Sequence, residues 1–226
     1  MKKNLLQTAG IVTTFSVLER SLGFFYRIVL ARLIGAEGMG LYQVSLSVFS
    51  VFLTLGTGGI PVSVSRLISK SKATLHSQDE DGATSAGLFL SFLFTFPVTV
   101  AFLFFKRPLS VFFTDRRCVS LFCILLTGLT ATSFYAVIRG SFWGNKEFFS
   151  TSLWELIEEA VMVIVGILII RSGDGAYEGA RKACVAVVLS YAVSFLLSVL
   201  AYFSKGRKLV SFRRQLKPLA SSSLPI

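Results

Sequence analysis

The amino-acid sequence predicts an all-α, polytopic membrane protein, and two observations lead to this prediction. Of the 226 residues, 53% are hydrophobic and only 15% are charged, whereas soluble domains carry about 25% charged residues. The apolar residues also lie in long blocks, and about 20 mostly apolar residues are enough to cross the hydrocarbon core as a helix. Such blocks cover residues 6–33, 40–66, 83–105, 119–139, 151–170 and 182–204. We therefore expect six transmembrane helices and no β-sheet.

The first block follows Lys2 and Lys3, as the apolar core of a secretory signal would. It continues well beyond the length of such a core, which is about 7–15 residues, and no small-x-small cleavage site stands out after it. We therefore interpret residues 6–33 as a retained first helix.

The net charge of +11 is explained by orientation in a membrane. Lysine and arginine are more frequent in alternate loops, beginning with the N-terminal segment, so the positive-inside rule places the N-terminus in the cytoplasm. The basic segment 205–217 is expected to lie near anionic membrane lipid. With the charge accounted for in this way, we expect no nucleic-acid partner.

Two arginines lie in the middle of the first block. One face of the predicted helix gathers four residues within about 60° of one another: Ser16, Arg20, Gly23 and Arg27. A central arginine costs about 2.5–3.5 kcal/mol to insert even on the mildest scale, so it faces protein or water. In one interpretation, Glu19 neutralises Arg20 and this face has a structural role, holding the first helix against its neighbours. We favour a hydrated cavity with two fixed cations for an anionic ligand, because only one acid accompanies the two arginines.

The second block contains three glycines and a proline within six residues: Gly56, Gly58, Gly59 and Pro61. In a membrane, a broken helix is tolerated only where protein or water satisfies the freed backbone groups. Transporters place such breaks beside their substrates and use them as hinges. A packing kink between closely approaching helices is the alternative, and both interpretations place this helix inside the protein.

Other charged residues are predicted near the cytoplasmic ends of helices. Arg66 and Arg139 are expected there, where they guide an anionic head group into the cavity or simply mark the topology. At the start of the fifth block, Ser152 and Glu155 fit a capping box. Glu158 and Glu159 follow, either as acids at the positive end of the helix dipole or as groups that couple transport to protons or sodium.

No enzyme signature is found: the chain has no G-x-S-x-G, no Walker loop and no H-E-x-x-H. The three cysteines form no CxxC pair, and the single histidine, His76, lies in a polar loop. We therefore expect no enzymatic activity, no metal and no cofactor.

Three segments carry a family resemblance: "LGFFYRIVLARLIGAEGMGLYQ", "GTGGIPVSVSRLISK" and "IRGSFWGNKEFFSTSLWELIEEAV". They resemble the stage V sporulation protein B and polysaccharide-biosynthesis branch of the multidrug/oligosaccharidyl-lipid/polysaccharide (MOP) exporter superfamily, which is related to lipid II flippases. The resemblance implies two helical lobes around a central cavity, a cytoplasmic N-terminus and a spore-forming source. It also implies translocation of lipid-linked sugar precursors, including the peptidoglycan precursor, by alternating access.

Six helices form only one lobe of such a transporter. The resemblance therefore implies an N-terminal lobe over residues 1–204 and a basic cytoplasmic segment over 205–226, which leads into a truncated seventh helix. An N-terminal fragment is the expectation, with the C-terminal lobe as its missing partner.

Three functional hypotheses follow. In the first, the chain is a flippase lobe in which Arg20 and Arg27, with Glu19 and Ser16 beside them, meet the pyrophosphate of a lipid-linked saccharide. In the second, it belongs to a cation-coupled multidrug-type antiporter that depends on Glu19. In the third, it is a truncated membrane protein that transports nothing.

Overall fold

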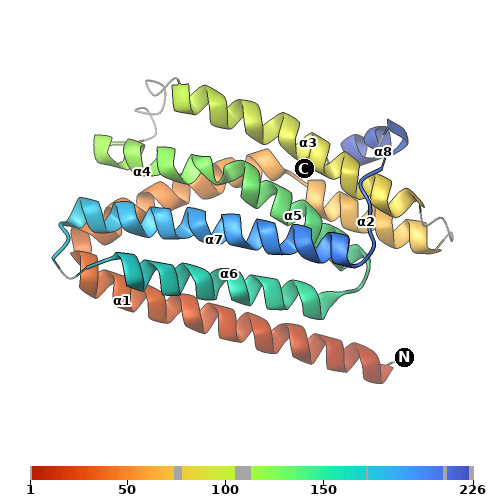
Figure 1. Ribbon diagram of the computed structural model, residues 1–226, viewed down its shortest axis with the longest axis horizontal. Helices are drawn as coiled ribbons and strands as arrows, with labels where there is room; N and C mark the ends of the chain where they lie inside the picture. The colour runs from red at the N-terminus through yellow and green to blue at the C-terminus, as the bar shows by residue number, and fades with distance from the viewer. Residues whose placement is uncertain (1, 74–77, 105–112, 172, 211–212, 224–226) are drawn as a thin grey trace.

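The computed structural model describes residues 2–73, 78–104, 113–171, 173–210 and 213–223, which form helices and connecting turns without any strand. The helices, shown in Figure 1, are α1 (Lys2–Thr57), α2 (Ile60–Ala73), α3 (Gln78–Phe104), α4 (Arg116–Thr127), α5 (Leu129–Gly144), α6 (Phe148–Ile169), α7 (Ala176–Ser204) and α8 (Arg213–Ser223). The predicted all-α fold class is therefore confirmed.

Helix α1 consists of two arms that meet at Gly35, where φ is 71° and ψ is 178°. A positive φ is unfavourable for residues with a Cβ atom, so glycine suits this position. Figure 1 shows the first arm (2–34) running from the end with the N-terminus to the opposite end, and the second arm (36–57) running back. These arms correspond to the first two predicted blocks.

The second arm is broken where the glycines and the proline predicted a break. It ends at Thr57, Gly58 adopts a positive φ of 48°, and α2 begins at Ile60. Pro61 occupies the second position of α2, where its missing N–H leaves no hydrogen bond of the helix unmade. The break itself is thus present, while its use as a hinge stays a prediction.

The fourth predicted block is two helices rather than one. Helices α4 and α5 are bent by 44° relative to each other at Gly128. A Cβ atom at Gly128 would lie 3.3 Å from the ring of Tyr191 on α7, so the bend brings the chain close to its neighbour. Hydropathy cannot register such a bend, because both halves are equally apolar.

Several predicted helix ends were wrong. Helix α2 continues to Ala73 and α3 begins at Gln78, so both helices extend into the polar segment between the second and third predicted blocks. Helix α7 begins six residues before the predicted start, and α6 begins at Phe148. The capping box at Ser152 is also wrong, because Ser152 is buried inside α6. Hydropathy locates only the apolar part of a helix. Polar turns in contact with water can continue the helix beyond that part, so the predicted ends fell short. His76 lies outside the described residues.

The helices are apolar enough for a membrane. By length and composition, three helical stretches of the described residues qualify as spans, and the bent pair α4–α5 could form a fourth. One of them, Ala9–Lys72, contains both arms of α1. Large apolar side chains such as Phe25, Leu55 and Phe104 are 63%, 74% and 81% exposed, as expected for lipid-facing surface. The chain is a multi-pass membrane protein, and six crossings stay a prediction.

Glycines bring α2 and α5 into backbone contact. A Cβ atom at Gly140 of α5 would overlap the carbonyl oxygen of Pro61, and one at Gly144 would lie 2.8 Å from the carbonyl oxygen of Ser65. Small residues commonly permit such close approach of helices in membranes. This contact fixes α2 beyond the break against α5.

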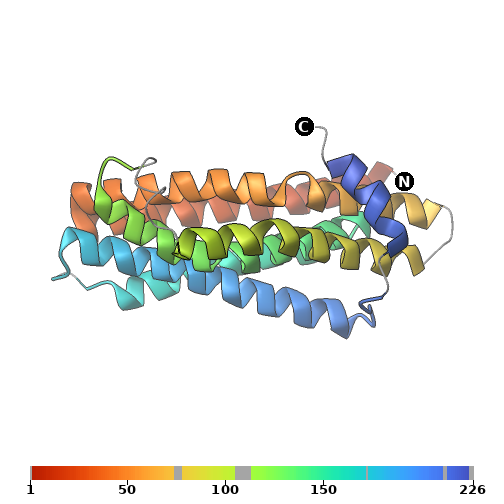
Figure 2. The ribbon, with the colours of Figure 1, turned by 90° about the horizontal axis from the view of Figure 1, so that it is seen from above.

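The segment that follows α7 is bound to the start of α3. The hydroxyl of Tyr202 and the backbone N–H of Lys208 both donate to the Asp81 carboxylate, at 3.0 and 3.1 Å. The backbone N–H of Val210 donates to the Ser85 hydroxyl at 3.2 Å. Figure 2 shows α8 lying across α3 and α2 at this end of the bundle, which also holds the N-terminus.

Ion pairs hold both ends of the bundle. Near the N-terminal end, Lys205 and Arg207 both pair with Glu147. At the opposite end, Arg117 pairs with Glu37 at 2.7 Å and with Asp115 at 2.8 Å. The hydrogen bond from the Arg117 side chain holds the pKa of Asp115 below its ordinary value. The exposed pairs of Arg117 each contribute little stability, whereas Arg207 and Glu147 are partly buried.

The α2–α5 contact gives a direct test of the packing. Gly140→Ala should lower the free energy of unfolding by about 1–3 kcal/mol, because the new methyl group overlaps backbone that cannot move independently. Gly10→Ala is the matched control, since a Cβ atom there meets nothing within 4 Å. Thermal unfolding of the purified chain in detergent, followed by circular dichroism, measures both. Equal unfolding temperatures for the two variants would contradict the described packing.

Candidate functional site

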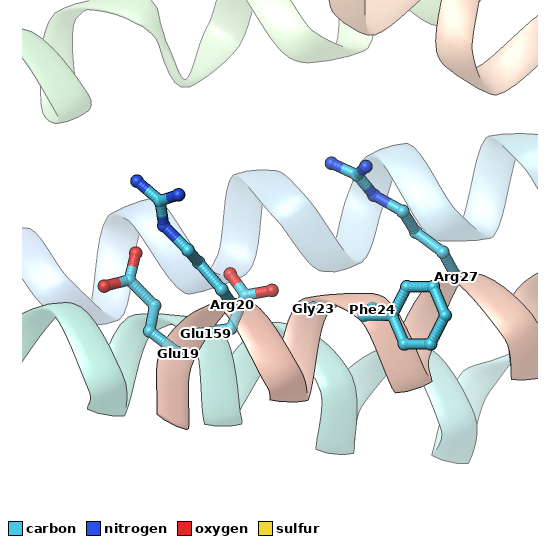
Figure 3. Close-up of a pocket in the computed structure, with 6 residues that line it drawn as sticks. All are labelled: Glu19, Arg20, Gly23, Phe24, Arg27 and Glu159. Atoms are coloured by element: carbon cyan, nitrogen blue, oxygen red, sulfur yellow. The ribbon is translucent and has the colours of Figure 1, made fainter. Parts of the chain in front are cut away.

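The two arginines of the first arm lie in one pocket of about 390 Å³. Its lining residues are Glu19, Arg20, Gly23, Phe24, Arg27 and Glu159. Figure 3 shows Arg20 and Arg27 extending from α1 toward the same side, with Glu159 reaching in from α6. The pocket therefore contains Arg20, Gly23 and Arg27, three of the four residues that helical spacing placed on one face, with Glu19 beside them.

Neither arginine is neutralised by a direct ion pair. None of the salt bridges among the described residues includes Arg20 or Arg27. Both side chains are exposed, so the pocket opens at the side of the bundle. Seven residues separate them, which corresponds to about 10 Å along the helix. The pocket thus offers two separate guanidinium groups to one ligand.

Glu159 reaches this pocket because residue 23 is glycine. A Cβ atom at Gly23 would lie 2.5 Å from Oε1 of Glu159, so the carboxylate rests against the backbone of α1. Glu159 interacts electrostatically with Glu19 and with Arg27. The lining therefore holds two cationic and two acidic side chains, rather than the cationic excess expected from α1 alone. Because neither arginine forms a direct ion pair with these acids among the described residues, both guanidinium groups can donate to a bound anion.

A second pocket of about 500 Å³ lies between α2, α5 and α6. It is lined by Pro61, Val62, Ser65, Arg66, Ala136, Arg139, Gly140, Trp143 and Glu155. Nη1 of Arg139 donates to Oε1 of Glu155 at 2.6 Å, and these side chains are 39% and 21% exposed. The prediction that Arg66 and Arg139 lie at helix ends was wrong, because both lie within helices and face this pocket.

The two pockets are neighbours along the bundle. Figure 1 shows α6 and the first arm of α1 running in the same direction. Glu155 of the second pocket precedes Glu159 of the first by one helical turn. Glu19 interacts electrostatically with both Glu155 and Arg139. The second pocket therefore begins about one turn nearer to the N-terminal end.

Two residues predicted for the site lie elsewhere, and two others were missed. Ser16 lines neither pocket, and Glu158 lies near Tyr135 of α5 and Tyr191 of α7. Phe24 and Trp143 line the first and second pocket, respectively. Nothing in an apolar block distinguishes an aromatic side chain that lines a pocket from one that faces lipid.

Of the predicted hinge residues, Pro61 lines the second pocket, whereas Gly56 lies against α3. Pro61 lines that pocket, directly after the break at Gly58 and Gly59. Gly56 packs against α3, where a Cβ atom would lie 2.9 Å from Cγ2 of Thr95. The break is therefore placed so that a change in its angle would reshape the second pocket.

Apolar helices that enclose ionisable pockets define a polytopic membrane protein of the kind found among transporters. The chain belongs to the polysaccharide biosynthesis protein family, whose model matches residues 5–226. This family is a branch of the MOP exporter superfamily, as the sequence resemblance implied.

Two curated relatives come from Bacillus subtilis. Stage V sporulation protein B is 26% identical over 216 residues, covering 94% of this chain and 41% of that protein. The lipid II flippase MurJ is 23% identical over 174 residues, covering 73% of this chain and 32% of that protein. The chain thus spans less than half the length of these relatives.

Solved structures share the fold over about half their length. A MATE protein crystallised with Br-NRF has a TM-score of 0.77 at 18% identity, covering 96% of this chain and 51% of that chain. A MOP superfamily transporter from Pyrococcus furiosus has a TM-score of 0.78 at 19% identity, with the same coverage. The described helices therefore have the fold of one half of such a molecule.

The ion pair in the second pocket predicts a measurable coupling. Arg139→Ala should destabilise the chain because it leaves the half-buried Glu155 carboxylate unpaired, and Glu155→Ala should relieve most of that loss. We expect a coupling free energy of about 0.5–2 kcal/mol in a double-mutant cycle. Thermal unfolding in detergent measures it, with Arg66→Ala as the control because Arg66 lines the same pocket and enters no ion pair with another described residue. Strictly additive effects would show that the pair contributes nothing.

Proposed function

We propose that this chain is the first lobe of a flippase that carries a lipid-linked saccharide pyrophosphate across the cytoplasmic membrane, and that it is not an enzyme. The observation that carries the proposal is the pocket in which Arg20 and Arg27 project from one face of α1. Membership of the polysaccharide biosynthesis family and the flippase among its relatives support the same substrate class.

The chemistry of the arginines suits a pyrophosphate. A guanidinium group is planar and donates paired hydrogen bonds to phosphate oxygens, which a lysine cannot reproduce. Arginine also stays charged in an apolar setting, where water competes weakly for the ligand. Arg20 and Arg27 are spaced so that a pyrophosphate between them would receive donors from both sides.

The acids in the pocket make binding reversible. Two isolated arginines would hold an anion tightly and release it slowly. The carboxylates of Glu19 and Glu159 lie in the same pocket and can interact with the guanidinium groups once the substrate leaves. Protonation of either acid would raise the positive charge of the pocket and favour the anion. Glu159 is therefore our candidate for coupling transport to protons or another cation, and Glu158, which lies outside the pocket near Tyr135 and Tyr191, is a second candidate on the same helix.

Conformational change would centre on the broken second arm. The glycines at positions 58 and 59 interrupt the helix between α1 and α2, and Pro61 prevents an unbroken helix through this point. We infer that α2 and α5 move together, because their backbones are in contact at Gly140. Such a movement would alter access to the second pocket during alternating access.

A second lobe completes the transporter in this proposal. The arginine pocket opens at the side of the bundle, and a C-terminal lobe would supply its other wall and exclude lipid. The N-terminus and the segment after α7 lie at one end of the bundle in Figure 1. By the charge distribution of the loops, we assign that end to the cytoplasm. Membrane lipid would surround the remaining apolar faces.

A cation-coupled antiporter of small molecules is the second candidate. Its support is the pair of acids in the arginine pocket, Glu19 and Glu159, together with the fold shared with MATE proteins. In that mechanism the acids bind the transported cation, and the arginines only neutralise them.

Substitution of the arginines separates the two candidates. In the complete transporter, Arg20→Lys or Arg27→Lys should reduce flipping about tenfold or more, because paired hydrogen bonds to the pyrophosphate are lost. Complementation of a flippase-depleted strain measures this, with membrane levels checked by blotting. An antiporter should tolerate both changes and fail with Glu19→Gln. Normal growth with both arginines replaced by alanine would show that they have only a structural role and would contradict the proposed pyrophosphate site.

A further inference from the structure

The pocket between α2, α5 and α6 has the features of a saccharide subsite. It combines an exposed aromatic side chain, Trp143, with a carboxylate, two guanidinium groups and the hydroxyl of Ser65. Its volume of about 500 Å³ lies within the range of small-molecule sites, which is about 300–1,000 Å³. It is separate from the arginine pocket of α1, which shares none of its lining residues.

Trp143 presents a flat apolar surface to this pocket. It lies in the last turn of α5, is 45% exposed, and is braced by an edge contact with Phe148, whose ring centroid is 5.8 Å away. A tryptophan gains much binding energy when its large ring is covered. The contact with Phe148 of α6 holds the ring in place, and its exposed part is available to a flat ligand in the pocket that it lines.

The polar groups of the pocket can both donate and accept hydrogen bonds. Arg139 holds Oε1 of Glu155 at 2.6 Å, which fixes the carboxylate while leaving its second oxygen as an acceptor. Arg66 enters no ion pair among the described residues and adds further donors. Sugar hydroxyl and acetamido groups require such mixed donors and acceptors.

The ion pair in this pocket, rather than its net charge, favours a saccharide over a second phosphate. Arg139 is already paired with Glu155 at 2.6 Å, so a phosphate at Arg139 would have to displace that carboxylate and would be repelled by it, whereas Arg20 and Arg27 form no such pair among the described residues. A neutral, polyhydroxylated ring avoids this repulsion and can use the carboxylate as an acceptor. The aromatic wall adds nothing to phosphate binding but suits the apolar face of a sugar ring.

The order of the two pockets matches the order of groups in a lipid-linked saccharide. In such a molecule the pyrophosphate separates the prenyl chain, which lies in the membrane core, from the sugar, which points toward the aqueous phase. The second pocket begins about one helical turn nearer to the N-terminal end than the arginine pocket. A pyrophosphate at Arg20 and Arg27 would therefore place its first sugar beside Trp143 and Glu155.

We propose that this pocket binds the sugar directly attached to the pyrophosphate. Trp143 stacks on one face of the ring, while Glu155 and Arg139 bind its hydroxyl or acetamido groups. This inference rests on the proposed function, because it takes the pyrophosphate to lie at the two arginines of α1. Specificity for the first sugar then resides in this lobe, next to the break at Gly58 and Gly59.

A binding measurement with two probes tests the subsite. The complete transporter that contains this lobe, reconstituted in nanodiscs, is titrated with undecaprenyl pyrophosphate and with the same lipid carrying one N-acetylglucosamine. We expect the sugar-bearing lipid to bind about tenfold more tightly, or about 1.4 kcal/mol. Trp143→Ala should abolish this difference without weakening the sugar-free lipid, and Glu155→Gln should reduce it at nearly unchanged volume. Phe94→Ala, at a similarly exposed aromatic position (47%) outside both pockets, should change neither affinity.

The outcomes separate the subsite from the proposed function. If both lipids bind equally to the native transporter, while Arg20→Ala weakens both, the subsite is wrong and the pyrophosphate site stands. If the sugar-bearing lipid binds more tightly but Trp143→Ala and Glu155→Gln leave that preference unchanged, the sugar is bound elsewhere. If neither lipid binds, although the protein still unfolds cooperatively and is therefore folded, both the subsite and the proposed pyrophosphate site are overturned.

Discussion

The structure depends on one constraint: a charged side chain inside an apolar bundle must meet another charge, water or a ligand. Arg139 meets this requirement through Glu155 at 2.6 Å. Arg20 and Arg27 have no such direct partner in the part of the chain that the structure describes, and instead line an open pocket that they share with two acids. An anionic ligand is the occupant we propose, because it would give both guanidinium groups the direct hydrogen-bond partner that they lack among the described residues.

Glycine makes the charged array sterically feasible. At Gly23 it admits the Glu159 carboxylate to the surface of α1, and at Gly140 it admits the backbone of α2 to α5. At Gly35 and Gly58 it permits the positive φ values that reverse the chain and interrupt the second arm. The same small residue thus sets both the distance between pocket walls and the place where a wall can bend.

The sequence was sufficient for the fold class, the arginine face and the break, because each depends on local spacing. Arg20, Gly23 and Arg27 lie on the same face of their helix wherever that helix packs in the fold. The pairing of Arg139 with Glu155 was missed because it depends on how α5 packs against α6. The position of Glu159 depends likewise on the contact between α6 and Gly23. Trp143 gave no signal, since its environment is created by three helices together.

The most direct test of the central claim is whether water and a pyrophosphate lipid reach positions 20 and 27. Arg20→Cys and Arg27→Cys are made after Cys118, Cys123 and Cys184 are replaced, and membranes are treated with a charged thiol reagent. Both positions should react, and added undecaprenyl pyrophosphate should protect them, whereas a cysteine at lipid-facing Phe25, which is 63% exposed, should remain unlabelled. Failure of both positions to react, or reaction that the lipid leaves unchanged, would contradict the account.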